Sequence, residues 1–259
     1  MKNLTKNIVP AFAAACLILA AGQAQAVSVS IYSGNDISGI QSWFSSQGAT
    51  SLSDITILED FEGQTADWYD TLDSPDLGLF TATGEPGTGS TAYRGPDGAH
   101  FEIRDYDANG RYNVYPLGDD GTNYLDSADI TELSLQLYLD EDDQGLANLF
   151  FTMTDPGDVR GITTINGQTI EGTQNLDDIL NSQHNGSLFF VGIDGQGEDL
   201  TNVTWAVNRS NGDVHTNDGF GVDSIGTVNV PEPATALLLG AGLLPLMGFL
   251  RRKKEEDEV

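Results

Sequence analysis

The sequence predicts an all-β fold, an antiparallel β-sandwich of the jelly-roll-like kind, and three observations lead to this expectation. Residues 27–230 contain 26 of the 30 glycines, about 13% of that stretch, against an average of about 7% in proteins. The resulting turns divide the chain into many short apolar runs, about 8–12 residues apart as in β-sandwiches. Several runs alternate apolar and polar residues, which is typical of a strand with one buried face.

Eleven runs are predicted to be strands, and two show the alternation clearly. The leucines of Glu132–Leu139 occupy alternate positions and share one face, and Trp205 lies on the apolar face of Asn202–Asn208. Asn166-Gly167 separates two runs as a hairpin turn that needs positive φ. The predicted strands are Val27–Tyr32, Ile55–Phe61, Leu77–Thr83, His100–Arg104, Arg111–Tyr115, Glu132–Leu139, Leu146–Thr154, Gly161–Ile165, Ser187–Asp194, Asn202–Asn208 and Phe220–Val228.

Helices are expected to contribute little. Ile37–Phe44 and Leu176–Asn181 are predicted to be short helices, and neither is long enough to dominate the fold. The sequence contains no fixed-period repeat, long linker or low-complexity segment. Residues 27–230 are therefore expected to form one domain, flanked by terminal segments at 1–26 and 231–259.

The charge of this domain restricts its partners. The whole chain has a formal charge of −28, whereas residues 27–230 contain five arginines, no lysine and 34 acidic residues, a net charge of 5 − 34 = −29. Phosphate backbones and anionic lipid surfaces repel such a body. Nucleic-acid binding is therefore excluded.

The N-terminus is predicted to be a signal peptide that signal peptidase removes. Lys2 and Lys6 precede an apolar stretch at residues 8–21, and Ala24 and Ala26 place small residues at the −3 and −1 positions of a cleavage site. The alternative is an uncleaved membrane anchor, for which the stretch is short.

The only cysteine, Cys16, lies inside this apolar stretch. It is expected to leave with the peptide, because the preceding alanines make a poor lipoprotein cleavage motif. The mature chain then contains no cysteine and cannot be a disulfide scaffold.

The C-terminus combines three elements in order. Pro231, Glu232 and Pro233 are followed by the apolar run Ala234–Leu250. As a helix this run would be about 26 Å long, near the lower limit for crossing a bilayer. A basic cluster follows, which holds its end on the cytoplasmic side; its members are Arg251, Arg252, Lys253 and Lys254. A permanent single-pass anchor is the alternative interpretation.

These elements resemble the PEP-CTERM sorting signal of Gram-negative bacteria. The resemblance implies that an exosortase, an integral-membrane cysteine protease, cleaves near the Pro231–Pro233 triplet. It also implies an inner-membrane intermediate, followed by release to the cell surface or the extracellular polysaccharide. The chain departs from the family pattern in the acidic end at 255–259, although acids contribute little to the orientation rule.

The body resembles the jelly-roll domains of many PEP-CTERM proteins, which are related to carbohydrate-binding sandwiches. The resemblance lies in the apolar run Leu188–Ile193, then Leu200–Trp205, then Asp218–Ile225, with Asp60–Glu62 as an early strand. It covers about 50 residues, and it implies the fold rather than a function.

Asp105, Asp107 and Asn109 match the opening of a calcium loop, D-x-D-x-N-G. Oxygens at alternate positions converge on one ion. An EF-hand would have glutamate at position 12, where this chain has Pro116, so the loop is not an EF-hand. Asp119 or Asp120 could complete the ligand shell. The alternative is an ordinary acidic turn.

A second candidate calcium site joins the two ends of the domain. Asp218 and Asp223, near the last strand, could meet Glu59, Asp60 or Glu62 near the start. Carboxylates brought together repel unless a cation lies between them. The alternative is that some of these side chains face water.

Catalytic patterns are poor. The three histidines have no metal-ligand spacing, no G-x-S-x-G sequence occurs, and the mature chain has no cysteine nucleophile. A sugar-stacking platform is one interpretation of several aromatic residues, with core packing as the alternative; they are Trp43, Trp68, Tyr69, Tyr93, Tyr106, Tyr112 and Tyr115.

The sequence thus predicts an exported, exosortase-processed, non-catalytic surface or extracellular-matrix protein, associated with extracellular polysaccharide or biofilm. A secreted carbohydrate-active hydrolase on the same scaffold and a permanently tethered binding module stay open as alternatives.

Overall fold

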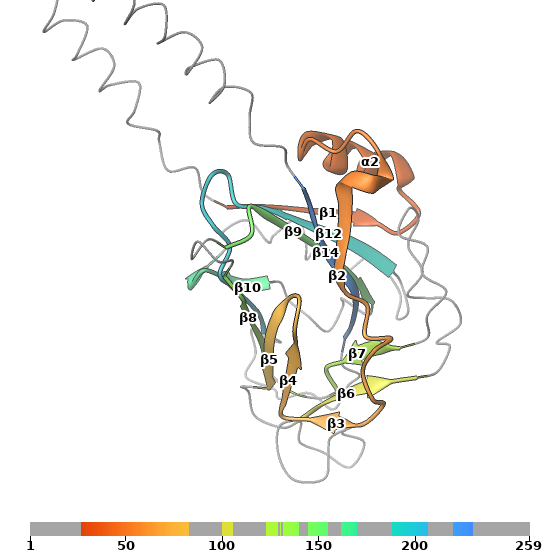
Figure 1. Ribbon diagram of the computed structural model, residues 1–259, viewed down its shortest axis with the longest axis vertical. Coiled ribbons are helices and arrows are strands. Elements are labelled where there is room, and N and C mark those ends of the chain that lie inside the picture. The colour runs from red at the N-terminus through yellow and green to blue at the C-terminus, as the bar shows by residue number, and fades with distance from the viewer. Residues whose placement is uncertain are drawn as a thin grey trace, which may run out of the picture.

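The computed structural model contains two antiparallel β-sheets, as expected for an all-β sandwich (Figure 1). It describes residues 27–82, 100–105, 123–128, 130, 132–139, 145–154, 162–169, 188–206 and 220–229. One sheet has eight strands and the other has six, and every pair of neighbouring strands runs antiparallel.

The eight-stranded sheet joins strands from both ends of the domain. In spatial order its strands are β1 (Ser28–Ser33), β12 (Leu188–Asp194), β9 (Asn148–Thr154), β14 (Gly221–Val228), β7 (Tyr124–Asp126), β6 (Phe101–Arg104) and β3 (Trp68–Tyr69), with β2 (Ile55–Glu59) also paired to β14. The six-stranded sheet has the order β11 (Gln168–Thr169), β10 (Ile162–Ile165), β13 (Asn202–Ala206), β8 (Glu132–Leu137), β5 (Gly78–Ala82) and β4 (Thr71–Ser74).

Ten of the eleven predicted strands correspond to strands of the structure, with ends that differ by a few residues. The predicted strand Arg111–Tyr115 and the predicted helix Leu176–Asn181 lie outside the described residues. The hairpin turn is confirmed: Asn166 and Gly167 join β10 to β11 with φ of 52° and 72°.

The core between the sheets explains the alternation in the six-stranded sheet. In β8 the leucines are buried and the residues between them are partly or fully exposed, because one face packs on the other sheet. Trp205 is fully buried, as predicted, with its ring 5.3 Å from that of Phe151 in an edge-to-face arrangement.

In β9, by contrast, all seven residues are buried. Leu149 and Phe151 belong to the core between the sheets, whereas Phe150 belongs to a second cluster on the opposite face. Successive side chains of a strand point to opposite faces, so β9 is covered on both sides.

Helix α2 (Ile37–Ser46) provides this second cover. Ile40, Trp43 and Phe44 are its buried residues, and the i, i+3, i+4 spacing places them on one stripe. They pack with Phe150, Phe190 and Val228. The predicted helix is confirmed and extends two residues further. Trp43 is 3% exposed, so the sugar-platform interpretation is wrong for this residue and the core alternative holds.

A bulge in β14 adjusts which residues face the core. The register with β9 shifts between Asp223 and Gly226, and Ser224 has a φ of 50°. Val222 and Ile225, three positions apart, consequently both join the core between the sheets.

Candidate functional site

The first candidate site is the acidic junction between β2 and β14. These strands pair antiparallel, with Glu59 opposite Ile225 and therefore two residues from Asp223. The early acidic strand and the last strand are therefore neighbours in one sheet, whereas the meeting of their carboxylates at one ion stays a prediction. Glu59 and Asp223 are 8% and 4% exposed, so both carboxylates lie largely out of water.

Backbone and amide donors bind the Glu59 carboxylate. Its Oε1 accepts a hydrogen bond from the N–H of Phe61 at 2.7 Å, and its Oε2 accepts one from Gln64 Nε2 at 3.0 Å. Phe61 is in the left-handed region, with φ of 60°, and its side chain is fully buried. The segment after β2 is therefore a tight turn around a buried carboxylate. The two hydrogen bonds offset part of the free-energy cost of removing the Glu59 carboxylate from water.

Asn123 fastens this turn to the segment before β7. Its backbone N–H donates to Glu62 Oε1 at 2.6 Å, and its side-chain amide donates to the carbonyls of Phe61 and Gln64 at 3.1 and 3.3 Å. Sequence reasoning missed Asn123, because a lone asparagine 61 residues from Glu62 carries no local signal.

The remaining acidic candidates are only partly described. Asp223 Oδ1 accepts the N–H of Ser224 at 2.6 Å, and Asp105 is exposed directly after β6. Asp107, Asn109, Pro116, Asp119, Asp120 and Asp218 lie outside the described residues. Within the described ranges, no group of three or more histidine, cysteine, aspartate or glutamate residues is arranged to hold a metal. Calcium binding stays a prediction.

An ion-pair cluster on β6 and β7 was also missed. Arg104 Nε lies 2.8 Å from Glu102 Oε2 and 2.8 Å from Asp126 Oδ2, and all three side chains are largely buried. The i, i+2 spacing of Glu102 and Arg104 on one strand face was the available signal. Two carboxylates on one guanidinium make a structural clamp between neighbouring strands.

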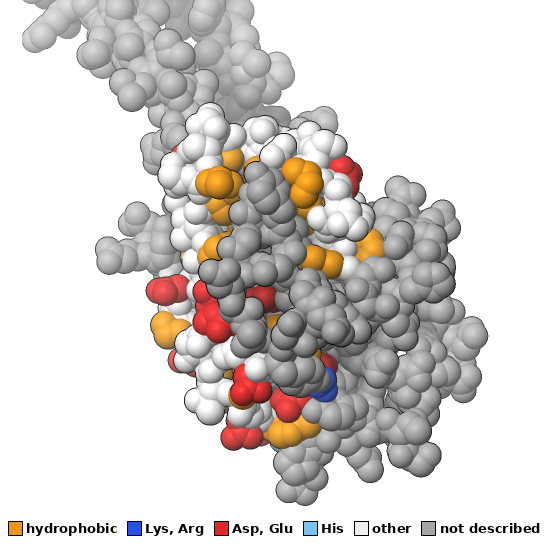
Figure 2. Space-filling model, turned by 90° about the vertical axis from the view of Figure 1, so that its right-hand side faces the viewer, with side chains coloured by type: hydrophobic (Ala, Val, Ile, Leu, Met, Phe, Trp, Pro, Cys, Tyr) orange, Lys and Arg blue, Asp and Glu red, His pale blue; other side chains and the backbone are white. Residues whose placement is uncertain are grey.

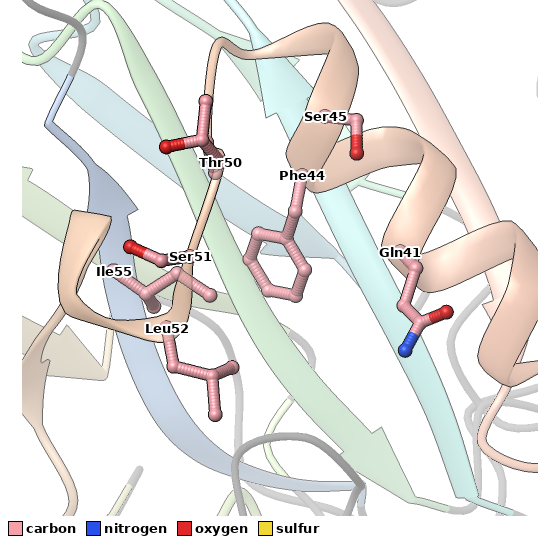
Figure 3. A pocket seen from close by; sticks show the side chains of 8 residues that line it. Gln41, Phe44, Ser45, Thr50, Ser51, Leu52 and Ile55 are labelled. Atoms are coloured by element: carbon pink, nitrogen blue, oxygen red, sulfur yellow. The ribbon is translucent and has the colours of Figure 1, made fainter.

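The second candidate site is a pocket of about 310 Å³ between α2 and the 3-10 helix η1 (Leu52–Asp54). Figure 3 shows the Phe44 ring projecting from α2 toward the chain that leads into η1. The floor is apolar and the rim carries hydroxyl and amide groups; the lining residues are Gln41, Phe44, Ser45, Ala49, Thr50, Ser51, Leu52 and Ile55. The sequence signal for this region is a run of 17 residues, 37–53, without a charged side chain.

Asn229, directly after β14, lies beside this pocket. The backbone N–H of Asn229 donates to the carbonyl of Asp54 at 2.9 Å, and its side-chain amide donates to Thr56 Oγ1 at 2.9 Å. The buried Asn148 holds the preceding residue, donating to the Val228 carbonyl at 3.1 Å and accepting its N–H at 2.8 Å. The last strand is therefore fixed up to Asn229.

The targeting residues lie outside the described part of the chain; they are Ala24, Ala26, Pro231, Glu232, Pro233, Arg251, Arg252, Lys253 and Lys254. Among the helices that the structure describes, none has the length and apolar character needed to cross a membrane. The predicted span at 234–250 is not one of the described segments.

Comparison with protein families identifies the C-terminal segment. Residues 229–254 match the PEP-CTERM protein-sorting motif. The matched segment contains the Pro231–Pro233 triplet and ends at the last residue of the basic cluster. Searches of curated proteins and of solved structures gave no match. The chain thus carries the motif of an exported protein that is targeted to exosortase.

Proposed function

We propose that this chain is an exported β-sandwich protein that exosortase cleaves near Pro231–Pro233, and that the released domain is a non-catalytic component of the cell surface or extracellular matrix. The observation that carries this proposal is the position of the sorting motif. The match begins at Asn229, the residue directly after β14, which hydrogen bonds hold to Asp54 and Thr56. The sorting motif therefore begins directly after the last strand of the sandwich.

The proposed route has two membrane steps. Signal peptidase cleaves after Ala26, and the apolar run Ala234–Leu250 then holds the precursor in the inner membrane. The basic cluster at 251–254 keeps the tail on the cytoplasmic side. Cleavage near the triplet releases the domain to the surface or the medium.

Alanine substitution of both prolines tests the processing step. Pro231→Ala/Pro233→Ala in the full chain is expected to leave the protein in the membrane fraction, because the cleavage motif is gone while the apolar run remains. Pro75→Ala, in the turn between β4 and β5, is the matched control and should be released normally. Release of both variants at the same rate would contradict exosortase processing.

For the released domain, we propose association with extracellular polysaccharide on a sandwich of the jelly-roll-like kind. The supporting observation is the charge of about −29 without lysine in residues 27–230, which keeps a matrix protein soluble and away from phosphate polymers. A glycan-binding screen of the mature domain, scored for hydrolysis as well as binding, tests this role. Hydrolysis would favour the carbohydrate-active hydrolase, and binding without hydrolysis supports the present proposal.

Calcium is the cofactor that we propose, at two sites. The ligands at the β2–β14 junction are Asp223, Glu62 and Asp218. The ligands at the D-x-D-x-N-G sequence are Asp105, Asp107 and Asn109. The first site is supported by the buried Asp223, two residues along β14 from the residue that pairs with the buried Glu59, because a cation offsets the repulsion between carboxylates. Melting with calcium should occur at a higher temperature than melting with EGTA, since an ion bound only by the folded state stabilises it. Identical melting curves would end the calcium proposal.

A further inference from the structure

The distance between the folded domain and the sorting segment is short. Asn229 is hydrogen-bonded to Asp54 and Thr56, and only residues 230–233 separate it from the apolar run that begins at Ala234. The five steps of extended chain from Asn229 to Ala234 reach at most about 18 Å. The headgroup layer on one side of a bilayer is about 5–8 Å thick. A chain tethered by this run therefore holds Asn229 within about 13 Å of the lipid headgroups.

The surface next to Asn229 differs from the rest of the domain in charge. Residues 37–53, which we call the uncharged cap, comprise most of α2 and η1 and contain no charged side chain. The two aspartates that flank it are engaged locally. Asp36 Oδ1 accepts the N–H of Gly39 at 3.0 Å, and Asp54 Oδ2 accepts the N–H groups of Thr50 and Ser51 at 2.8 and 2.9 Å.

The exposed groups of the uncharged cap suit a lipid interface. Its exposed polar residues carry hydroxyl and amide groups, which hydrogen-bond to headgroups; they are Ser38, Gln41, Ser42, Ser45, Ser46, Thr50, Ser51 and Ser53. Leu52 is 62% exposed beside the apolar floor of the pocket. In Figure 2, most of the visible acidic side chains lie in the half of the domain away from the α2 end.

The surface on the β9 side of β14 is less suitable for contact with lipid than the surface on the β2 side. Beyond β9, the turn at 195–200 carries Glu198 and Asp199 and is joined to Ala147 by the N–H of Gly195 at 2.9 Å. β2 lies on one edge of β14 and β9 on the other. A domain tilted toward β2 brings the uncharged cap to the lipid and moves these acids away from it.

We propose that the uncharged cap is the surface that rests on the lipid bilayer while the precursor is held by its sorting segment, a proposal that depends on the function proposed above. An acidic body is repelled by anionic lipid. An uncharged surface at the tether point removes this repulsion where contact is unavoidable. The cap thus fixes the orientation in which the Pro231–Pro233 triplet meets the membrane.

The test uses site-specific quenching in the full-length chain. Cys16 is the only natural cysteine, so Cys16→Ala permits single fluorophores at Leu52→Cys in the cap or at the exposed Asp76→Cys before β5. The chain is reconstituted into vesicles of phosphatidylethanolamine and phosphatidylglycerol that carry nitroxide-labelled headgroups. Strong quenching is expected at position 52 and little at position 76.

Equal quenching at the two positions would overturn the proposal. A change in the fluorescence at position 52 that occurs only when exosortase is added would also overturn it, since the cap would then contact the enzyme and not the lipid. Flotation of the chain with the vesicles distinguishes a failure of the membrane-tethered precursor from a failure of the docking proposal. A chain that does not float contradicts the membrane-tethered precursor itself, and the docking proposal with it. A chain that floats without selective quenching contradicts only the docking proposal.

Adding a charge to the cap provides a second, independent variant. Ser45→Asp, with the fluorophore at position 52, should lower the ratio of docked to undocked domain about fivefold on anionic vesicles, and much less on purely zwitterionic ones. Thr65→Asp, exposed and outside the cap, is the matched control and should leave docking unchanged. An equal effect of both substitutions would contradict a local contact between cap and lipid.

Discussion

The uncharged cap and the acidic segment at residues 67–76 have opposite surfaces in the same domain. The cap has no charged side chain in 17 residues, whereas the segment has Asp67, Asp70, Asp73 and Asp76 within ten, all of them exposed. Figure 1 shows α2 and β3 at opposite ends of the domain. The acidic side chains of this domain are therefore not distributed evenly. The cap lies at the end from which the chain continues into the sorting motif.

The two regions also differ in how they are attached. Trp43 of the cap has edge-to-face contacts with Phe44, Phe150 and Phe190, at ring distances of 5.4, 6.1 and 5.4 Å. In the acidic segment, Tyr69 is half-buried and stacks on Phe101 at 6.0 Å. The uncharged surface is thus carried by a rigid aromatic base, which a docking surface needs to hold its orientation.

The largest effect is expected from removing that base. Trp43→Ala should lower the free energy of unfolding by about 3–5 kcal/mol, because it leaves a large cavity among packed rings. Tyr69→Ala, the matched change in the acidic segment, should cost clearly less, since this ring is only partly buried. Urea denaturation of both variants measures the difference. Equal losses would show that the cap is no better packed than the acidic segment.

A smaller effect is expected from a methyl group beneath Trp43. A Cβ at Gly192 would collide with the indole ring, so Gly192→Ala should destabilise the domain by about 1–3 kcal/mol through overpacking. Its control is Gly63→Ala, where a Cβ would meet nothing within 4 Å. Hydrogen exchange of α2 amides should accelerate in the first variant only. Unchanged exchange in Gly192→Ala would mean that α2 is not seated on the sheet through Trp43.

The smallest effect concerns the edge of the cap and depends on pH. The backbone N–H of Thr50, then its hydroxyl and the N–H of Ser51, hold the pKa of Asp54 below its ordinary value of 3.8. The carboxylate therefore contributes stability that is present above pH 3.8 and is lost as the pH falls through the lowered pKa.

Asp54→Asn should accordingly lower the melting temperature at pH 7, and this difference from the natural chain should shrink as the pH falls below 3.8. Asp76→Asn, an exposed aspartate of the acidic segment, should lower it less at pH 7. Thermal melts at pH 7 and below pH 3.8 make the comparison. A difference for Asp54→Asn that is no smaller at the lower pH would contradict the role given to the ionised carboxylate.

The sequence was sufficient for strands with a strong apolar pattern. The alternation in β8 and the apolar residues Leu149, Phe150 and Phe151 of β9 both indicate strands, although only the structure explains why β9 is buried on both faces. The strands β3, β4, β7 and β11 were missed. They are two to four residues long, and pairing with neighbouring strands, not their own pattern, forms them.

The candidate site was predictable to a similar extent. The meeting of the early acidic strand with the last strand followed from the sequence, whereas the bulge at Ser224 and the role of Asn123 depend on tertiary contacts. The run of uncharged residues at 37–53 is visible in the sequence. Its position beside Asn229 is not, because that position results from the pairing of β2 with β14.

The intact mass of the mature protein, collected from the cell surface or the medium, is the most direct test of exosortase processing. The mature chain is expected to begin at Val27, to end near Pro231–Pro233 and to lack the basic cluster at 251–254. A surface protein that retains residues 251–254 would contradict exosortase processing and would favour a permanently tethered binding module.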